Sequence, residues 1–157
     1  AEELPADAYR DDVAANLAVA ERWVTEHPDT EFDFFLPPYS ILFWDKVIRE
    51  GRTEAVFAAI RQAGQTLLQY DNVKFYGYLM DPEIVTNLDN YCDYIHHSGG
   101  VCREILAMLQ REEGRLTEEN LEETLANWRE FVVHYDYDQF WDERFWIQWN
   151  AEHAAAP

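Results

Sequence analysis

Apolar residues recur at helical spacing near the start of the chain. Four of them follow one another at intervals of four, three and four residues: Val13, Leu17, Ala20 and Val24. This spacing places them on one face of a helix, because an α-helix completes one turn in about 3.6 residues. Asp7 precedes the stripe as a candidate N-cap, and Pro28 ends it because the residue before a proline disfavours helical backbone.

Two apolar stretches with short helices between them are typical of strands in an α/β sheet. Residues 32–36 are nearly all apolar, which predicts a strand covered on both faces, and residues 72–79 predict a second strand. Between them, a helix over residues 41–50 has Ser40 as its candidate N-cap and Gly51 as its stop, and Thr53 is the candidate cap of the next helix. Strands joined through helices predict a sheet with parallel strands, although two strands are too few for a stable one.

The last part of the chain is acidic and rich in aromatic residues. A helix that Thr117 caps has four apolar residues at inward spacing: Leu121, Leu125, Trp128 and Val132. Further on, Trp141, Phe145 and Trp149 also follow helical spacing. These three aromatic residues predict either a helix packed over the sheet or a surface that stacks on sugars or docks a partner, and packing is the preferred interpretation.

Composition restricts the class of partner. The chain of 157 residues is long enough for one domain with a single core, and its 31 acidic against 12 basic residues give a formal net charge of -19. Such a chain repels nucleic acid and anionic membranes, since phosphate binding requires clustered Lys and Arg. No stretch approaches the roughly 20 apolar residues of a membrane helix, so no membrane insertion is expected.

The candidate chemistry lies in a loop after the second predicted strand. Asp93 and His96 stand three positions apart, just ahead of a helix predicted from about Ser98. A histidine that acts as a general base needs a carboxylate on one ring nitrogen, which holds the ring in one tautomer and orientation. The pair is therefore a candidate base with its orienting acid. The alternative is a histidine that is merely satisfied by hydrogen bonds within a loop.

Neighbouring residues offer competing interpretations of this loop. His97 has the same chemistry as His96 and is expected to pack or to line a pocket rim. Cys92 and Cys102 flank the loop; two free thiols are the preferred interpretation, and a disulfide is the alternative if the protein is exported. A metal site is not expected, because adjacent histidines rarely converge on one ion without further ligands. No cofactor is expected.

Two phrases of the sequence resemble one enzyme family. The stretch NLDNYCDYIH at residues 87–96 and the stretch PPYS at residues 37–40 look like the last third of an SGNH hydrolase, the family of GDSL-type esterases and acyltransferases. The similarity is greatest to a bacterial, envelope-associated branch. It implies a partial three-layer, flavodoxin-like α/β sheet over residues 1–114, with residues 115–157 as a helical extension of the same domain.

The resemblance also implies roles for individual residues. His96 would act as general base and then general acid, Asp93 would orient it, and His97, one position past the base, would be a candidate substrate contact. Tyr39 is a second candidate contact, because it stands at the carboxyl end of a predicted strand, the edge where open α/β sheets bind ligands; packing is the simpler alternative for Tyr39. That substrate would be an acylated small molecule or glycan, and the compartment would be the periplasm or cell envelope. The family's nucleophile block has no counterpart, since Ser40 and Ser98 are the only serines and neither has a nucleophile context.

Two functions are therefore expected. The first is the C-terminal portion of an ester hydrolase or O-acyltransferase, whose missing N-terminal half or a second copy of the chain would be a partner. The second is a non-catalytic binding or assembly module that uses the C-terminal aromatic residues.

Overall fold

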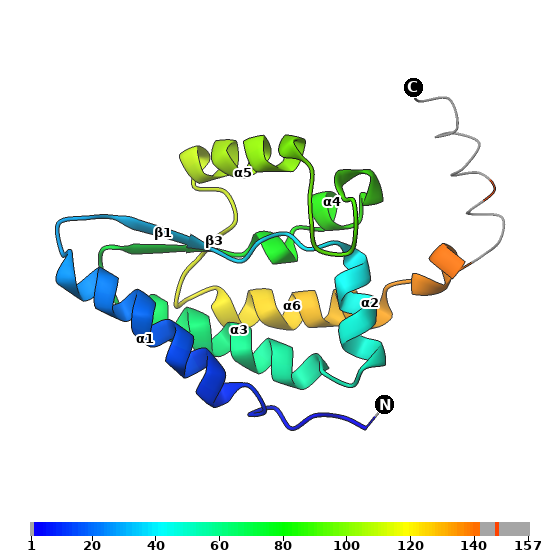
Figure 1. Cartoon of the computed structure of the whole chain (residues 1–157), viewed down its shortest axis with the longest axis horizontal. Coiled ribbons are helices and arrows are strands. Elements are labelled where there is room, and N and C mark those ends of the chain that lie inside the picture. Colours follow the sequence, from blue (N-terminus) through cyan, green and yellow to red (C-terminus); the bar gives the residue numbers. More distant parts are fainter. Residues whose placement is uncertain (1, 142–146, 148–157) are drawn as a thin grey trace.

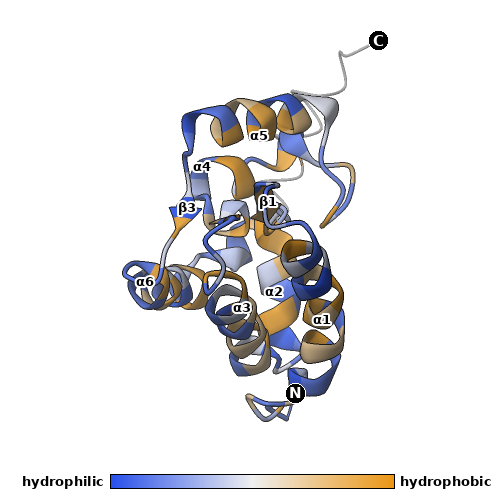
Figure 2. Ribbon diagram, turned by 90° about the vertical axis from the view of Figure 1, so that its left-hand side faces the viewer, coloured by the Kyte–Doolittle hydropathy of each residue, from blue (hydrophilic) through white to orange (hydrophobic). Residues whose placement is uncertain are grey.

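A small sheet of short strands lies between two layers of helices (Figures 1 and 2). The computed structural model describes residues 2–141 and residue 147. The helices are α1 (Arg10–Glu26), α2 (Ile41–Arg49), α3 (Thr53–Leu67), α4 (Pro82–Val85), α5 (Gly99–Arg111) and α6 (Leu121–His134). The strands are β1 (Phe32–Phe35), β2 (Val73–Tyr76) and β3 (Arg115–Leu116). Short 3-10 turns span Tyr78–Met80, Leu88–Asn90 and Tyr137–Trp141.

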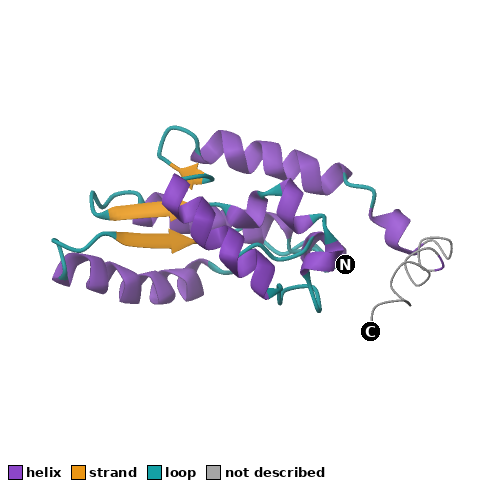
Figure 3. Cartoon of the chain, turned by 90° about the horizontal axis from the view of Figure 1, so that it is seen from above, coloured by secondary structure: helices purple, strands orange, loops and turns teal. Residues whose placement is uncertain are grey.

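The sheet has the order β1-β2-β3, and Figure 3 shows its two longer strands side by side. Strands β1 and β2 are parallel, with Phe32 opposite Val73 and Phe35 opposite Tyr76, so the predicted parallel pair is confirmed. Strand β3 pairs antiparallel with β2 and was not predicted. The fold is thus mixed α/β, with three strands in the described part of the chain.

The main core lies between the sheet and the helices α1, α2, α3 and α6. The apolar spacing of the sequence predicts its members well, because all four inward positions of α6 are buried: Leu121, Leu125, Trp128 and Val132. At its centre, Trp44 of α2 is completely buried and contacts the rings of Phe57 and Trp128, with centroids 5.1 and 6.0 Å away. Burial of such large aromatic surfaces is the main force that holds α2, α3 and α6 together.

Helix α5 covers the opposite face of the sheet and encloses a second, smaller core. Its buried residues Val101, Ile105 and Met108 pack on Tyr76 and Tyr78. Figure 2 shows α5 on one side of the strands and α1, α3 and α6 on the other.

Strand β1 is less covered than its sequence predicts. Its exposure alternates, with Phe32 and Phe34 half-buried and Asp33 and Phe35 exposed. Phe35 keeps 41% of its surface in contact with solvent. The prediction of a strand covered on both faces is therefore wrong, because α5 packs on β2 and leaves this face of β1 open.

The structure corrects one further sequence prediction and leaves two others untested. Helix α1 begins at Arg10 after Tyr9 rather than after Asp7. The predicted stripe of Trp141, Phe145 and Trp149 lies outside the described residues, apart from the backbone of Trp141 at the end of the last 3-10 turn. The boundary at residue 114 stays a prediction; β3 and α6 beyond it pack on β2, α2 and α3. In the described part, no helix is long and apolar enough to span a membrane.

Candidate functional site

The predicted catalytic residues lie in a tight loop at residues 91–97. Its two ends meet, since Tyr91 and His97 form an isolated antiparallel bridge and the Cys92 amide donates to the His96 carbonyl at 3.0 Å. The Ser98 amide then donates to the Asn90 carbonyl at 2.7 Å, just before α5 begins at Gly99. The loop is therefore held by its own backbone before any side chain contributes.

Asp93 organises the tip of this loop through both carboxylate oxygens. Its Oδ1 accepts hydrogen bonds from the amides of Ile95 and His96, at 2.8 and 2.7 Å. Its Oδ2 lies 2.6 Å from Nδ1 of His96, so the predicted hydrogen bond between the two side chains is present. The His96 side chain remains 70% exposed, and its Nε2 has no hydrogen-bond partner among the described residues. The ring is held at one nitrogen and open at the other.

These hydrogen bonds stabilise the charged form of Asp93. They lower the pKa of the Asp93 carboxyl from 3.8 to about 2; the bond from the His96 amide contributes most, followed by the His96 ring and the Ile95 amide. A carboxyl whose pKa is lower in the folded state stabilises that state above its unfolded pKa, and the contribution is lost as the pH falls through the folded pKa.

We expect the loop to keep its structure above about pH 4 and to lose it as the pH falls toward 2. The carboxyl carbon of Asp93 and the amides of Ile95 and His96, followed by NMR, should titrate together with a midpoint near 2. In Asp93→Asn the transition of the two amides should vanish. A midpoint near 3.8 would show that the hydrogen bonds do not form in solution.

The loop is tied to the carboxyl end of β1. Both the amide and Oγ of Ser40 donate to the Tyr94 carbonyl, at 3.1 and 2.9 Å, and the Tyr91 hydroxyl donates to the Pro38 carbonyl at 2.8 Å. Ser40 does occupy the N-cap position of α2, but its side chain makes no capping bond there. The predicted N-cap position of Ser40 is thus confirmed, but its hydroxyl binds the loop and not the helix.

An open hollow of about 320 Å³ lies between the loop and the end of β1. Its lining residues are Pro37, Tyr39, Ile95, His96 and His97. The structure thus places three of the four predicted site residues around one space, with Asp93 behind His96. The carboxyl end of parallel strands is also the edge at which open α/β sheets bind ligands.

The remaining candidate residues in and beside the loop, one histidine and two cysteines, form no hydrogen bond with the ring of His96 in the described part of the chain. His97 is half-buried, with Nδ1 3.7 Å from Sγ of Cys102, while Sγ of Cys92 donates to the His96 carbonyl and not to its ring. Both cysteines are free and exposed. Within the residues that the structure describes, no group of three or more His, Cys, Asp or Glu side chains is arranged to hold a metal ion.

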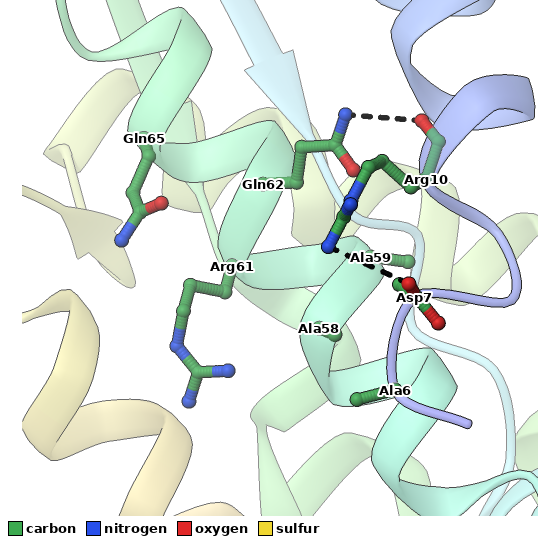
Figure 4. A pocket seen from close by; sticks show the side chains of 8 residues that line it. All are labelled: Ala6, Asp7, Arg10, Ala58, Ala59, Arg61, Gln62 and Gln65. Carbon is green, nitrogen blue, oxygen red and sulfur yellow. Dashed lines mark hydrogen bonds and ion pairs between the residues drawn. The ribbon is translucent and has the colours of Figure 1, made fainter.

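A second, larger hollow of about 560 Å³ lies on α3 beside the start of α1 (Figure 4). Arg10, Arg61 and Gln62 are among its polar lining residues. Sequence reasoning did not identify them, because Arg10 is far from the other two along the chain and no motif joins them. The only sequence signal is the spacing of Ala58, Arg61 and Gln65, which places them on one face of α3.

Comparison with known proteins finds only partial similarity, at low sequence identity. No protein-family model matches the chain, and no solved structure is significantly similar to it. Among curated proteins, the chain is similar to the "UPF0735 ACT domain-containing protein" of Lacticaseibacillus casei and to the protein of the same name from Lacticaseibacillus paracasei. Each is 24% identical over 90 residues, which cover 57% of this chain and 62% of the relative. The match thus spans less than two thirds of these relatives.

These findings contradict the predicted SGNH hydrolase. The relatives are named for an ACT domain and not for an esterase or acyltransferase, so the predicted family, its ester hydrolase or acyltransferase function and the envelope-associated branch are wrong. The structure explains the spacing of Asp93 and His96 locally: Asp93 closes a turn by accepting hydrogen bonds from the amides of Ile95 and His96. Whether His96, Asp93, Tyr39 and His97 contact a substrate or ligand stays a prediction.

Proposed function

We propose that this chain is a small-molecule-binding domain with a regulatory role, whose ligand occupies the hollow beside His96. The observation that carries the proposal is the exposed His96 ring, held through Nδ1 by Asp93 and open at Nε2. A ring held in one orientation loses little conformational entropy when a ligand binds to it. The curated relatives support the class of function, because an ACT domain in their name suggests regulation by a small molecule.

The lining of the hollow defines the ligand's chemistry. His96 and Tyr39 are lining residues with groups that can form hydrogen bonds, while Pro37 and Ile95 supply apolar surface. The net charge of -19 disfavours anionic ligands. The ligand is therefore an uncharged or zwitterionic small molecule with an apolar part.

We expect His96→Ala to weaken ligand binding at least about tenfold, since a lost hydrogen bond of roughly 1.4 kcal/mol corresponds to that factor. The ligand is found by NMR screening of sugars, nucleosides and amino acids for molecules that shift the ring signals of His96 and Tyr39. The affinity of the ligand found is then compared between variants.

The matched control for this experiment is His134→Ala. His134 is as exposed as His96, at 67% against 70% of the side chain, and also has an acidic neighbour at its Nδ1, Glu130. It lies at the end of α6, away from the hollow lining, so its removal should leave the affinity unchanged. The proposal fails if no molecule shifts the two rings, or if both variants bind equally well.

We also propose that the sheet of the described residues is part of a larger one. The described strands form part of an open, flavodoxin-like sheet, completed at β1 by a further segment of polypeptide or by a second copy of the chain. The amides of Phe32 and Leu36 donate hydrogen bonds to the carbonyls of Asn72 and Tyr76. The alternate residues Asp33 and Phe35 therefore direct their backbone groups away from β2. In the described part of the chain β1 is an edge strand, and its unpaired backbone groups support an additional neighbour, whereas the antiparallel β3 departs from an all-parallel sheet.

A further inference from the structure

The hollow on α3 is lined by two guanidinium groups, those of Arg10 and Arg61, whose hydrogen-bond donors are only partly used. Arg61 donates through Nε to both carboxylate oxygens of Glu122, at 3.0 and 2.9 Å. Both terminal amino groups of its guanidinium have no hydrogen-bond partner among the described residues. Arg10 lies 3.7 Å from Asp7, which is longer than a hydrogen bond. Two guanidinium groups that line the same hollow therefore have donors without a partner among the described residues (Figure 4).

Acceptors lie in the same hollow. Nε2 of Gln62 donates to the Arg10 carbonyl at 3.2 Å, which fixes the carboxamide and leaves its Oε1 without a donor among the described residues. The Asp7 carboxylate also lines the hollow. Between these polar groups, Ala58 and Ala59 form a floor of small apolar side chains. The volume of about 560 Å³ falls within the range of small-molecule sites, roughly 300–1,000 Å³.

The balance of charge determines what class of ligand fits. The positive charges of Arg10 and Arg61 are matched by the negative charges of Asp7 and Glu122, so these four groups carry no net charge. A simple anion would gain little here and would be repelled by the chain's net charge of -19. A molecule with one positive and one negative group avoids this repulsion and can satisfy both sets of side chains.

We propose that this hollow binds a small zwitterion, with its carboxylate on the guanidinium groups of Arg61 and Arg10 and its ammonium on Asp7 and Gln62. The alanine floor accommodates an apolar substituent. The site is separate from the hollow beside His96 and does not depend on it.

The probe is L-leucine, which carries a carboxylate, an ammonium and an apolar side chain. Titrated into the full chain, it should shift the Nε–Hε signal of Arg61 in a saturable manner without moving the His96 ring signals. N-acetyl-L-leucine lacks the ammonium and L-leucinamide lacks the carboxylate. Each should bind at least about tenfold more weakly, a difference of about 1.4 kcal/mol.

Variants assign the effect to the hollow. Arg61→Gln should weaken L-leucine binding at least about tenfold, and Arg10→Gln serves as a second variant should Arg61→Gln not fold. The control is Arg129→Gln, because Arg129 is similarly exposed (46% against 40%) and also pairs with an acid, Glu54, but lies on α6 outside the hollow. The proposal is overturned if L-leucine gives no saturable shift, if N-acetyl-L-leucine binds equally well, or if Arg129→Gln weakens binding as much as the variants in the hollow.

Discussion

Trp44→Ala is expected to lower the free energy of unfolding by about 3–5 kcal/mol, the range for a large aromatic residue removed from a core. Trp44 is completely buried and joins three elements, because its ring contacts Phe43 of its own helix, Phe57 of α3 and Trp128 of α6. Its indole Nε1 has no hydrogen-bond partner among the described residues. The cost therefore comes from lost apolar burial and from the cavity left behind, and not from a broken hydrogen bond.

Urea unfolding followed by circular dichroism measures this effect. The control is Trp23→Ala, since Trp23 lies on α1 with 49% of its surface exposed. A tryptophan that is half in water loses much less burial on truncation, so this variant should remain close to the parent in stability. Equal losses for the two variants would mean that α2 does not form the centre of the core.

Elements held by local patterns could be predicted from the sequence. The helical spacing of Leu121, Leu125, Trp128 and Val132 identifies the buried face of α6 because helix periodicity is a property of neighbouring residues. The hydrogen bond between Asp93 and His96 was predictable for the same reason, since three positions in a turn bring the two side chains together.

Elements held by distant partners could not be predicted. Strand β3 consists of Arg115 and Leu116 alone, too short for any alternation, and it exists because β2 offers a free edge. The exposure of Phe35 depends on where α5 packs, which its own apolar neighbours do not reveal. Likewise, the two hollows join residues far apart along the chain: Tyr39 with His96 in one, and Arg10 with Arg61 in the other.

Tyr91→Phe is expected to lower the free energy of unfolding by about 1–3 kcal/mol, the penalty for leaving a buried acceptor unpaired. The Tyr91 hydroxyl donates to the carbonyl of Pro38 at 2.8 Å, and Pro38 is almost fully buried. Burial raises the pKa of the Tyr91 hydroxyl, so it remains protonated and able to donate. Loss of this bond leaves the Ser40–Tyr94 contacts to hold the loop against the end of β1.

The same substitution should therefore loosen the hollow beside His96, whose walls come from the segments that this bond connects. Urea unfolding measures the loss of stability, and hydrogen exchange at the Ser40 amide, which donates to the Tyr94 carbonyl, reports the loosening. Tyr94→Phe is the matched control from the same loop: its exposed hydroxyl accepts only a long hydrogen bond, 3.4 Å, from Nζ of Lys46, so its removal should change stability by less than about 0.5 kcal/mol. If the two variants lose equal stability, or if exchange at Ser40 is unchanged in Tyr91→Phe, the Tyr91–Pro38 bond does not position the loop. We expect faster exchange in Tyr91→Phe alone, because only that variant removes a buried connection between the loop and the strand.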